Sequence, residues 1–126
     1  MINKSLLLLF TIAFSLTSFA QDYTKFQIQR ATMFSNYIAE ELELNESDQK
    51  FVYDVMLARV YNSNAKIKLE NLTSREDKQA VYSAEYKVAQ GKLADKFGAK
   101  MARKMMTLSN EAVSYTHLTL PTTVIV

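Results

Sequence analysis

The sequence predicts an all-α domain of three helices, arranged as an antiparallel helical hairpin or a small bundle. Three observations lead to this fold class. The chain of 126 residues contains two Gly and one Pro, whereas β-sandwiches and barrels need many more turn residues. Apolar residues recur three or four positions apart, which is the helical period. Two short segments have the pattern of helix N-caps and divide the chain into three helical stretches.

The first 20 residues are predicted to form a signal peptide. Lys4 precedes an apolar run that extends from Leu6 to Phe14, and the segment ends in Ser-Phe-Ala at Ala20. This order is typical of a secretory signal peptide, and the run is shorter than the roughly 20 residues of a membrane-spanning helix. We therefore expect cleavage after Ala20, a periplasmic or secreted protein, and no transmembrane span. An uncleaved N-terminal anchor is the alternative.

Residues 113–126 differ abruptly from the preceding sequence. They are rich in Thr and β-branched residues and contain no charged residue. Val113 to Thr122 matches, without a mismatch, the conceptual translation of a transposase sequencing adapter. We interpret 113–126 as a non-native tail and 21–112 as a helical domain truncated at its C-terminus, with a genuine edge strand as the alternative. On this interpretation the single His, His117, does not belong to the protein.

The first two helices are predicted at about 24–42 and 46–70. Each has an apolar stripe at helical spacing. Asn45 precedes the second helix and stands three residues before Asp48, so that its side chain can accept a hydrogen bond from an early helical N–H. A strand competes with the second helix because Val and aromatic residues are frequent there, but the length of the segment and its lack of alternation favour a helix. The stripes consist of Phe26, Met33, Phe34, Tyr37, Ile38 and Leu42, and of Phe51, Val52, Val55, Met56 and Val60.

The third helix is predicted at about 74–110. Thr73 and Glu76 have the spacing of a capping box at its start. The helical period then continues through Tyr82, Tyr86, Ala89, Leu93, Phe97, Met101, Met105 and Leu108. At about 1.5 Å per residue, such a helix would be roughly 55 Å long.

Small residues recur every seven positions along this third helix, at Ala84, Gly91 and Gly98. Small residues at this spacing would allow another helix to approach closely. Alternatively, each Gly merely weakens the helix, by about 1 kcal/mol relative to Ala, and Gly98 marks a bend. Because a helical set of this length buries a limited core, we also expect a homo-oligomer, most simply a dimer, or docking against the missing C-terminal sequence.

No pattern in the sequence predicts catalysis, a metal site or a cofactor. The chain has no Cys, and without His117 any acid–base chemistry would require carboxylates, Lys or Tyr. The acidic residues 40–48 lie at an expected turn, where solvated carboxylates are the usual finding. Met101, Met105 and Met106 suit core packing better than binding of Cu(I) through their thioethers. We therefore expect no enzymatic activity, no cofactor and no bound metal ion.

A row of basic residues is the candidate partner-binding site. The row follows one side of the third helix and consists of Lys92, Lys96, Lys100, Arg103 and Lys104. It would suit an acidic partner or lipid head groups. The alternative is a solvated face without a partner. The formal net charge of +2 and the expected export both argue against nucleic acid as the partner.

Two five-residue boxes resemble the Leu-Thr-x-x-Gln motif of the Spy/CpxP-like periplasmic proteins. They are Leu44-Asn45-Glu46-Ser47-Asp48 and Leu72-Thr73-Ser74-Arg75-Glu76. Both have an acidic residue where the motif has Gln, and the first has Asn in place of Thr. The resemblance implies a helical envelope-stress chaperone or sensor, usually dimeric, whose basic surface holds unfolded clients. A structural or regulatory envelope protein that homodimerises or binds one partner, without chaperone activity, is the alternative.

Overall fold

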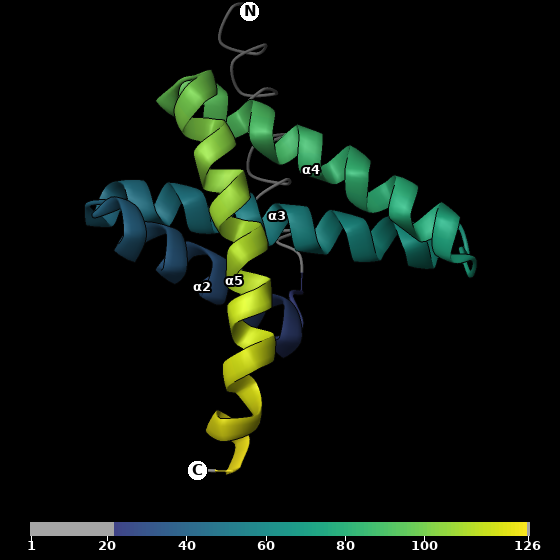
Figure 1. Ribbon diagram of the computed structural model, residues 1–126. Helices are drawn as coiled ribbons and strands as arrows, with labels where there is room; N and C mark the ends of the chain where they lie inside the picture. The colour runs from purple at the N-terminus through teal and green to yellow at the C-terminus, as the bar shows by residue number, and fades with distance from the viewer. Residues whose placement is uncertain (1–21, 126) are drawn as a thin grey trace, which may run out of the picture.

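The computed structural model describes residues 22–125 and the side chains of residues 22–113, and this part of the chain contains four helices and no strand. The helices are α2 (Lys25–Leu42), α3 (Glu46–Leu69), α4 (Arg75–Phe97) and α5 (Ala99–Ile125), as Figure 1 shows. The all-helical fold class is thus confirmed. The predicted signal peptide lies outside the described residues.

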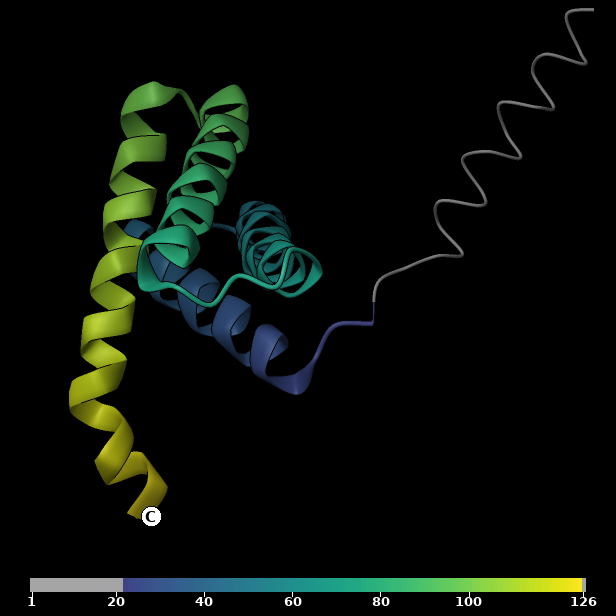
Figure 2. The ribbon, with the colours of Figure 1, turned by 90° about the vertical axis from the view of Figure 1, so that its right-hand side faces the viewer.

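The prediction of three helices is wrong, because the expected third helix at 74–110 is two helices. α4 ends at Phe97, and α5 begins at Ala99 and runs back along α4 (Figures 1 and 2). The backbone of α5 is helical to Ile125, beyond the end that the sequence pattern predicted.

Gly98 alone connects α4 to α5. Its φ of 92° and ψ of 156° lie in a region that essentially only Gly occupies, and they end the helix abruptly. The Gly98 N–H still donates to the carbonyl of Ala94 at 2.8 Å, and its carbonyl accepts from the N–H of Ala102 at 3.0 Å. Gly98 therefore belongs to the hydrogen-bonding ladders of both helices while it reverses the chain direction.

The four helices pack as a small bundle. Helices that follow one another in the chain pack together, and α5 also returns to pack on α2. Figure 2 shows α5 passing beside α4 and then crossing one end of α2. The largest fully buried apolar side chains come from all four helices and are Ile38, Val52, Met56, Leu93, Met105 and Met106.

Local capping sets the start of each of the first three helices. Asn45 caps α3 as predicted, because its side chain accepts from the Asp48 N–H at 2.8 Å. The predicted cap of α4 at Thr73 is wrong by one residue. Ser74 is the N-cap and accepts from the Asp77 N–H at 3.1 Å, so the helix starts at Arg75. α2 begins with a reciprocal capping box between Thr24 and Gln27, which sequence analysis did not identify.

We predict opposite effects of an added methyl group at the two glycines. Gly98→Ala should lower the free energy of unfolding by about 1–3 kcal/mol, because Ala is strained at this backbone conformation. Gly91→Ala should raise it by about 0.5–1 kcal/mol, because Gly91 lies within α4 and a Cβ there would meet nothing within 4 Å. Urea denaturation followed by circular dichroism measures both. A Gly98→Ala protein at least as stable as the unmodified chain would contradict the turn at Gly98.

Candidate functional site

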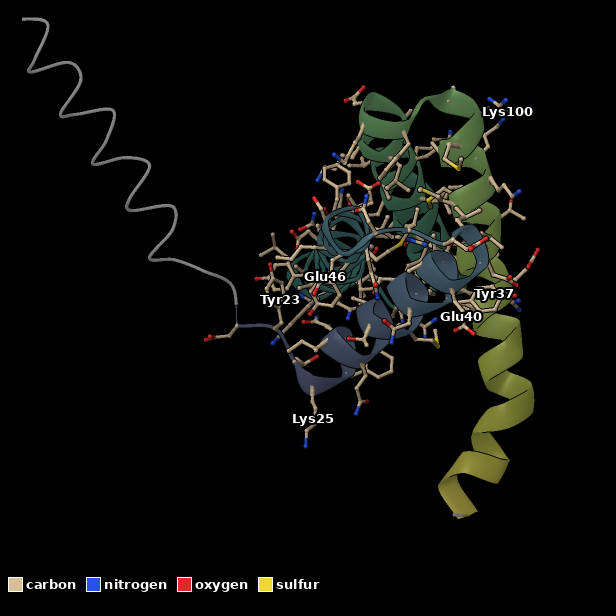
Figure 3. The ribbon with its side chains drawn as sticks, turned by 90° about the vertical axis from the view of Figure 1, so that its left-hand side faces the viewer. Tyr23, Lys25, Tyr37, Glu40, Glu46 and Lys100 are labelled. Atoms are coloured by element: carbon tan, nitrogen blue, oxygen red, sulfur yellow. The ribbon has the colours of Figure 1, made fainter. Side chains whose placement is uncertain are left out.

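The turn at Gly98 places the predicted basic row at one end of the molecule. Two of its members belong to the last turns of α4 and three to the first turns of α5, so they flank the turn instead of following one continuous helix. Figure 3 shows Lys100 at this end, pointing away from the bundle. We call this group the basic turn; all five of its side chains, Lys92, Lys96, Lys100, Arg103 and Lys104, are exposed.

Lys96 differs from the other members because it contacts the bundle. Its Nζ lies 5.2 Å from the ring centroid of Phe51 and 5.7 Å from that of Phe97. The two rings meet edge to face with centroids 5.8 Å apart. The Lys96 Nζ is also 3.9 Å from a carboxylate oxygen of Asp48. Lys96 thus joins the end of α4 to the start of α3, whereas within the described residues the other four cations of the basic turn form no ion pair.

The predicted small-residue positions lie on the outside of the molecule. Ala84, Gly91 and Gly98 are all exposed, and an added Cβ at either glycine would meet nothing within 4 Å. Among the described residues, no helix approaches these glycines closely enough to require a small residue. Gly98 acts through its backbone conformation, and the role of Ala84 and Gly91 in packing against a second chain stays a prediction.

The acidic residues and the methionines have separate environments. Glu40, Glu41, Glu43 and Glu46 are exposed. Met105 and Met106 are fully buried in the core, whereas Met101 is 37% exposed beside the basic turn.

Within the described residues, no three His, Cys, Asp or Glu side chains are grouped as a metal ion would require. Over the same part of the chain, no helix has both the length and the hydropathy to cross a bilayer.

Arg59 lies where the four helices meet. Its side chain extends from α3 and is partly buried. The guanidinium carbon lies 5.4 Å from the ring centroid of Phe34 on α2 and 5.2 Å from that of Tyr86 on α4. Its Nη1 atom donates to the Ser109 Oγ on α5 at 3.3 Å. One cationic side chain therefore contacts each of the other three helices.

The electrostatic environment of Arg59 would favour an anion. Within the described residues no carboxylate forms an ion pair with it. Burial lowers the pKa of the Arg59 guanidinium; Tyr86 opposes this change, and the neighbouring Arg30 cation adds to it. Because an Arg side chain stays charged in proteins, the bundle holds a partly desolvated cation that two aromatic rings and one hydroxyl group stabilise.

Sequence analysis did not identify Arg59, although a signal for it is present. Arg59 follows Met56 by three positions and precedes Val60 by one, so helical geometry places it beside the apolar stripe of α3. A single Arg at the edge of an apolar stripe is worth noting, because a charged side chain is rarely buried without a partner. Arg30 follows Phe26 by four positions and precedes Phe34 by four, so it lies on the face of α2 that carries these two rings.

Comparisons with known proteins do not identify a relative. No protein-family model matches the sequence, and neither a curated protein nor a solved structure matches it. The resemblance to the Spy/CpxP-like proteins therefore stays a prediction. A function has to be inferred from the residues and surfaces of the molecule itself.

We predict that the charge of Arg59 contributes little to stability, whereas its stem contributes more. Arg59→Met keeps much of the volume and removes the desolvated charge, so the free energy of unfolding should change by less than about 1 kcal/mol. Arg59→Ala also removes the packing between helices and should cost about 2–3 kcal/mol. Chemical denaturation measures both values. Equal, large losses in the two variants would show that the charge itself holds the helices together.

Proposed function

We propose that this chain is an exported, non-catalytic helical protein that acts by binding other proteins, and that its clients are unfolded chains. The observation that carries this proposal is the basic turn, where Met101, 37% exposed, directly follows Lys100 and precedes Lys104 by about one helical turn. Long Lys side chains and a flexible thioether can adapt to many partner surfaces. Unfolded chains present both carboxylates and apolar side chains, which such a surface can bind together.

The order of residues at the N-terminus supports the location of this activity. A cation, a short apolar run and a small-residue ending are features of a secretory signal peptide. An exported holding protein would meet unfolded clients in the periplasm or outside the cell. The partial match to the boxes of the Spy/CpxP-like proteins is in line with the same proposal.

We predict that the unmodified protein slows the aggregation of a chemically reduced, acidic client, as measured by light scattering. Changing Lys92, Lys100, Arg103 and Lys104 together to Gln should weaken this protection about tenfold, because each exposed charge pair contributes about 0.2–1 kcal/mol. The matched control changes four exposed cations elsewhere, Lys25, Lys66, Lys68 and Lys87, to Gln. This control variant lowers the net charge by the same amount as the basic-turn variant, and it should still protect the client from aggregation.

Two results would contradict this proposal. Aggregation that is unaffected by the unmodified protein would exclude the holding of unfolded clients. Equal losses in the two four-residue variants would show that total charge matters and that the basic turn is not the binding surface.

A structural or regulatory protein that homodimerises is the second candidate, and the outer face of α4 favours it. Ala84, Val88 and Gly91 lie on one side of this helix at spacings of four and three residues, and all are exposed. A second copy could approach closely over such a surface. This candidate would give no protection from aggregation in the same assay, together with a concentration-dependent dimer in sedimentation.

A further inference from the structure

A cavity of about 380 Å³ opens beside Arg59. Helices α2, α3 and α4 supply its wall except for Val113 of α5, the first residue of the segment interpreted as a non-native tail, and none of the lining residues is acidic. Its volume falls in the lower part of the range of roughly 300–1,000 Å³ that is typical of small-molecule sites. The lining residues are Phe26, Arg30 and Phe34 from α2, Arg59, Val60, Ser63 and Asn64 from α3, Tyr82 from α4 and Val113 from α5.

Two guanidinium groups share one aromatic ring in this wall. The Arg30 guanidinium carbon lies 5.7 Å from the centroid of Phe34, and that of Arg59 lies 5.4 Å from the same centroid. The two cations repel each other, and within the described residues neither forms an ion pair with a carboxylate. A bound anion would relieve this repulsion. A guanidinium group can offer two parallel N–H donors to a carboxylate, which makes this anion a good geometric match.

The rest of the wall would suit an apolar body. Phe26 is 59% exposed and Tyr82 is 43% exposed, although aromatic side chains of this size usually bury most of their surface. Both line the cavity, as does Val60. Ser63 and Asn64 add a polar edge. The wall therefore combines a cationic region with aromatic and aliphatic surface, and none of its lining residues is a carboxylate that would pair with a cation.

We propose that this cavity binds a small monocarboxylate with an alkyl or aryl body. The carboxylate lies against Arg30 and Arg59, and the apolar body lies along Phe26 and Tyr82. This site is separate from the basic turn, because Tyr82 precedes the end of α4 by about four helical turns. Carboxylate binding in the cavity is therefore independent of the proposed holding of clients at the basic turn, and a negative result for one does not contradict the other.

The test uses three probes with the same alkyl chain and different head groups, which are decanoate, decanol and decyltrimethylammonium. Isothermal titration calorimetry with the full chain should show saturable binding of one decanoate per chain. Decanol should bind at least about tenfold more weakly, since it lacks a charge-assisted hydrogen bond to Arg. Decyltrimethylammonium should show no saturable binding. Equal binding of the three probes, or no binding of decanoate, would overturn the proposal.

A pair of charge-matched variants locates the site. Arg30→Gln should weaken decanoate binding at least about tenfold, because it removes one of the two guanidinium groups. Arg75→Gln removes the same charge from an exposed position outside both the cavity and the basic turn, and it should leave binding unchanged. Arg59→Met provides a second variant within the cavity, and circular dichroism confirms the folding of each protein. Equal affinities in Arg30→Gln and Arg75→Gln would place the bound decanoate elsewhere and overturn the assignment.

Discussion

The backbone of Gly98 is the constraint on which the rest of the structure depends. Its positive φ turns the chain within one residue, so that α5 runs back along α4 and reaches α2. The hydrogen bond from Arg59 to Ser109 depends on this return, as does the bond from the Tyr37 hydroxyl group to Glu111 at 3.3 Å. Without the turn, α5 would not close the bundle and Arg59 would lose its contact with it.

The local features of the first two helices could be predicted from the sequence. The predicted ranges of 24–42 and 46–70 agree closely with α2 and α3, because caps and apolar periodicity are properties of neighbouring residues. Asn45 illustrates this, since its capping bond is made within its own helical turn. The predicted N-cap of α4, Thr73, differs from the observed one by one residue. Thr73 and Ser74 are both good N-cap residues, and Ser74 has the cap conformation.

The break at Gly98 could not be predicted in the same way. The apolar period continues in phase from Phe97 through Met101, so the sequence on either side reads as one helix. A Gly inside a helix costs only about 1 kcal/mol, which tertiary packing readily outweighs. The choice between a long helix and a turn therefore depends on the burial of Met105 and Met106 against the other helices, and that burial is not a local property.

The two candidate sites also differ in how far they can be recognised from neighbouring residues in the sequence. The basic turn was found as a run of cations in the sequence, although its shape follows from Gly98. The Arg30–Arg59 cavity was missed because its lining comes from four helices that are separated in the chain. Its apolar members look like ordinary parts of helix stripes, and its two arginines look like single charges beside them, until the bundle brings them together. Both sites therefore depend on the return of α5. The basic turn includes residues of α5 itself, and the cavity includes Arg59, which donates a hydrogen bond to α5.

The distance between α4 and α5 tests this account most directly. The chain has no Cys, so Lys87→Cys and Thr107→Cys, both exposed positions, can carry spin labels without competing sites. Pulsed electron paramagnetic resonance should give a label separation below about 20 Å, since packed helix axes lie about 8–10 Å apart. One continuous helix would place the two positions about 30 Å apart at about 1.5 Å per residue. A single distance distribution near that longer value would contradict the turn at Gly98 and the bundle that depends on it.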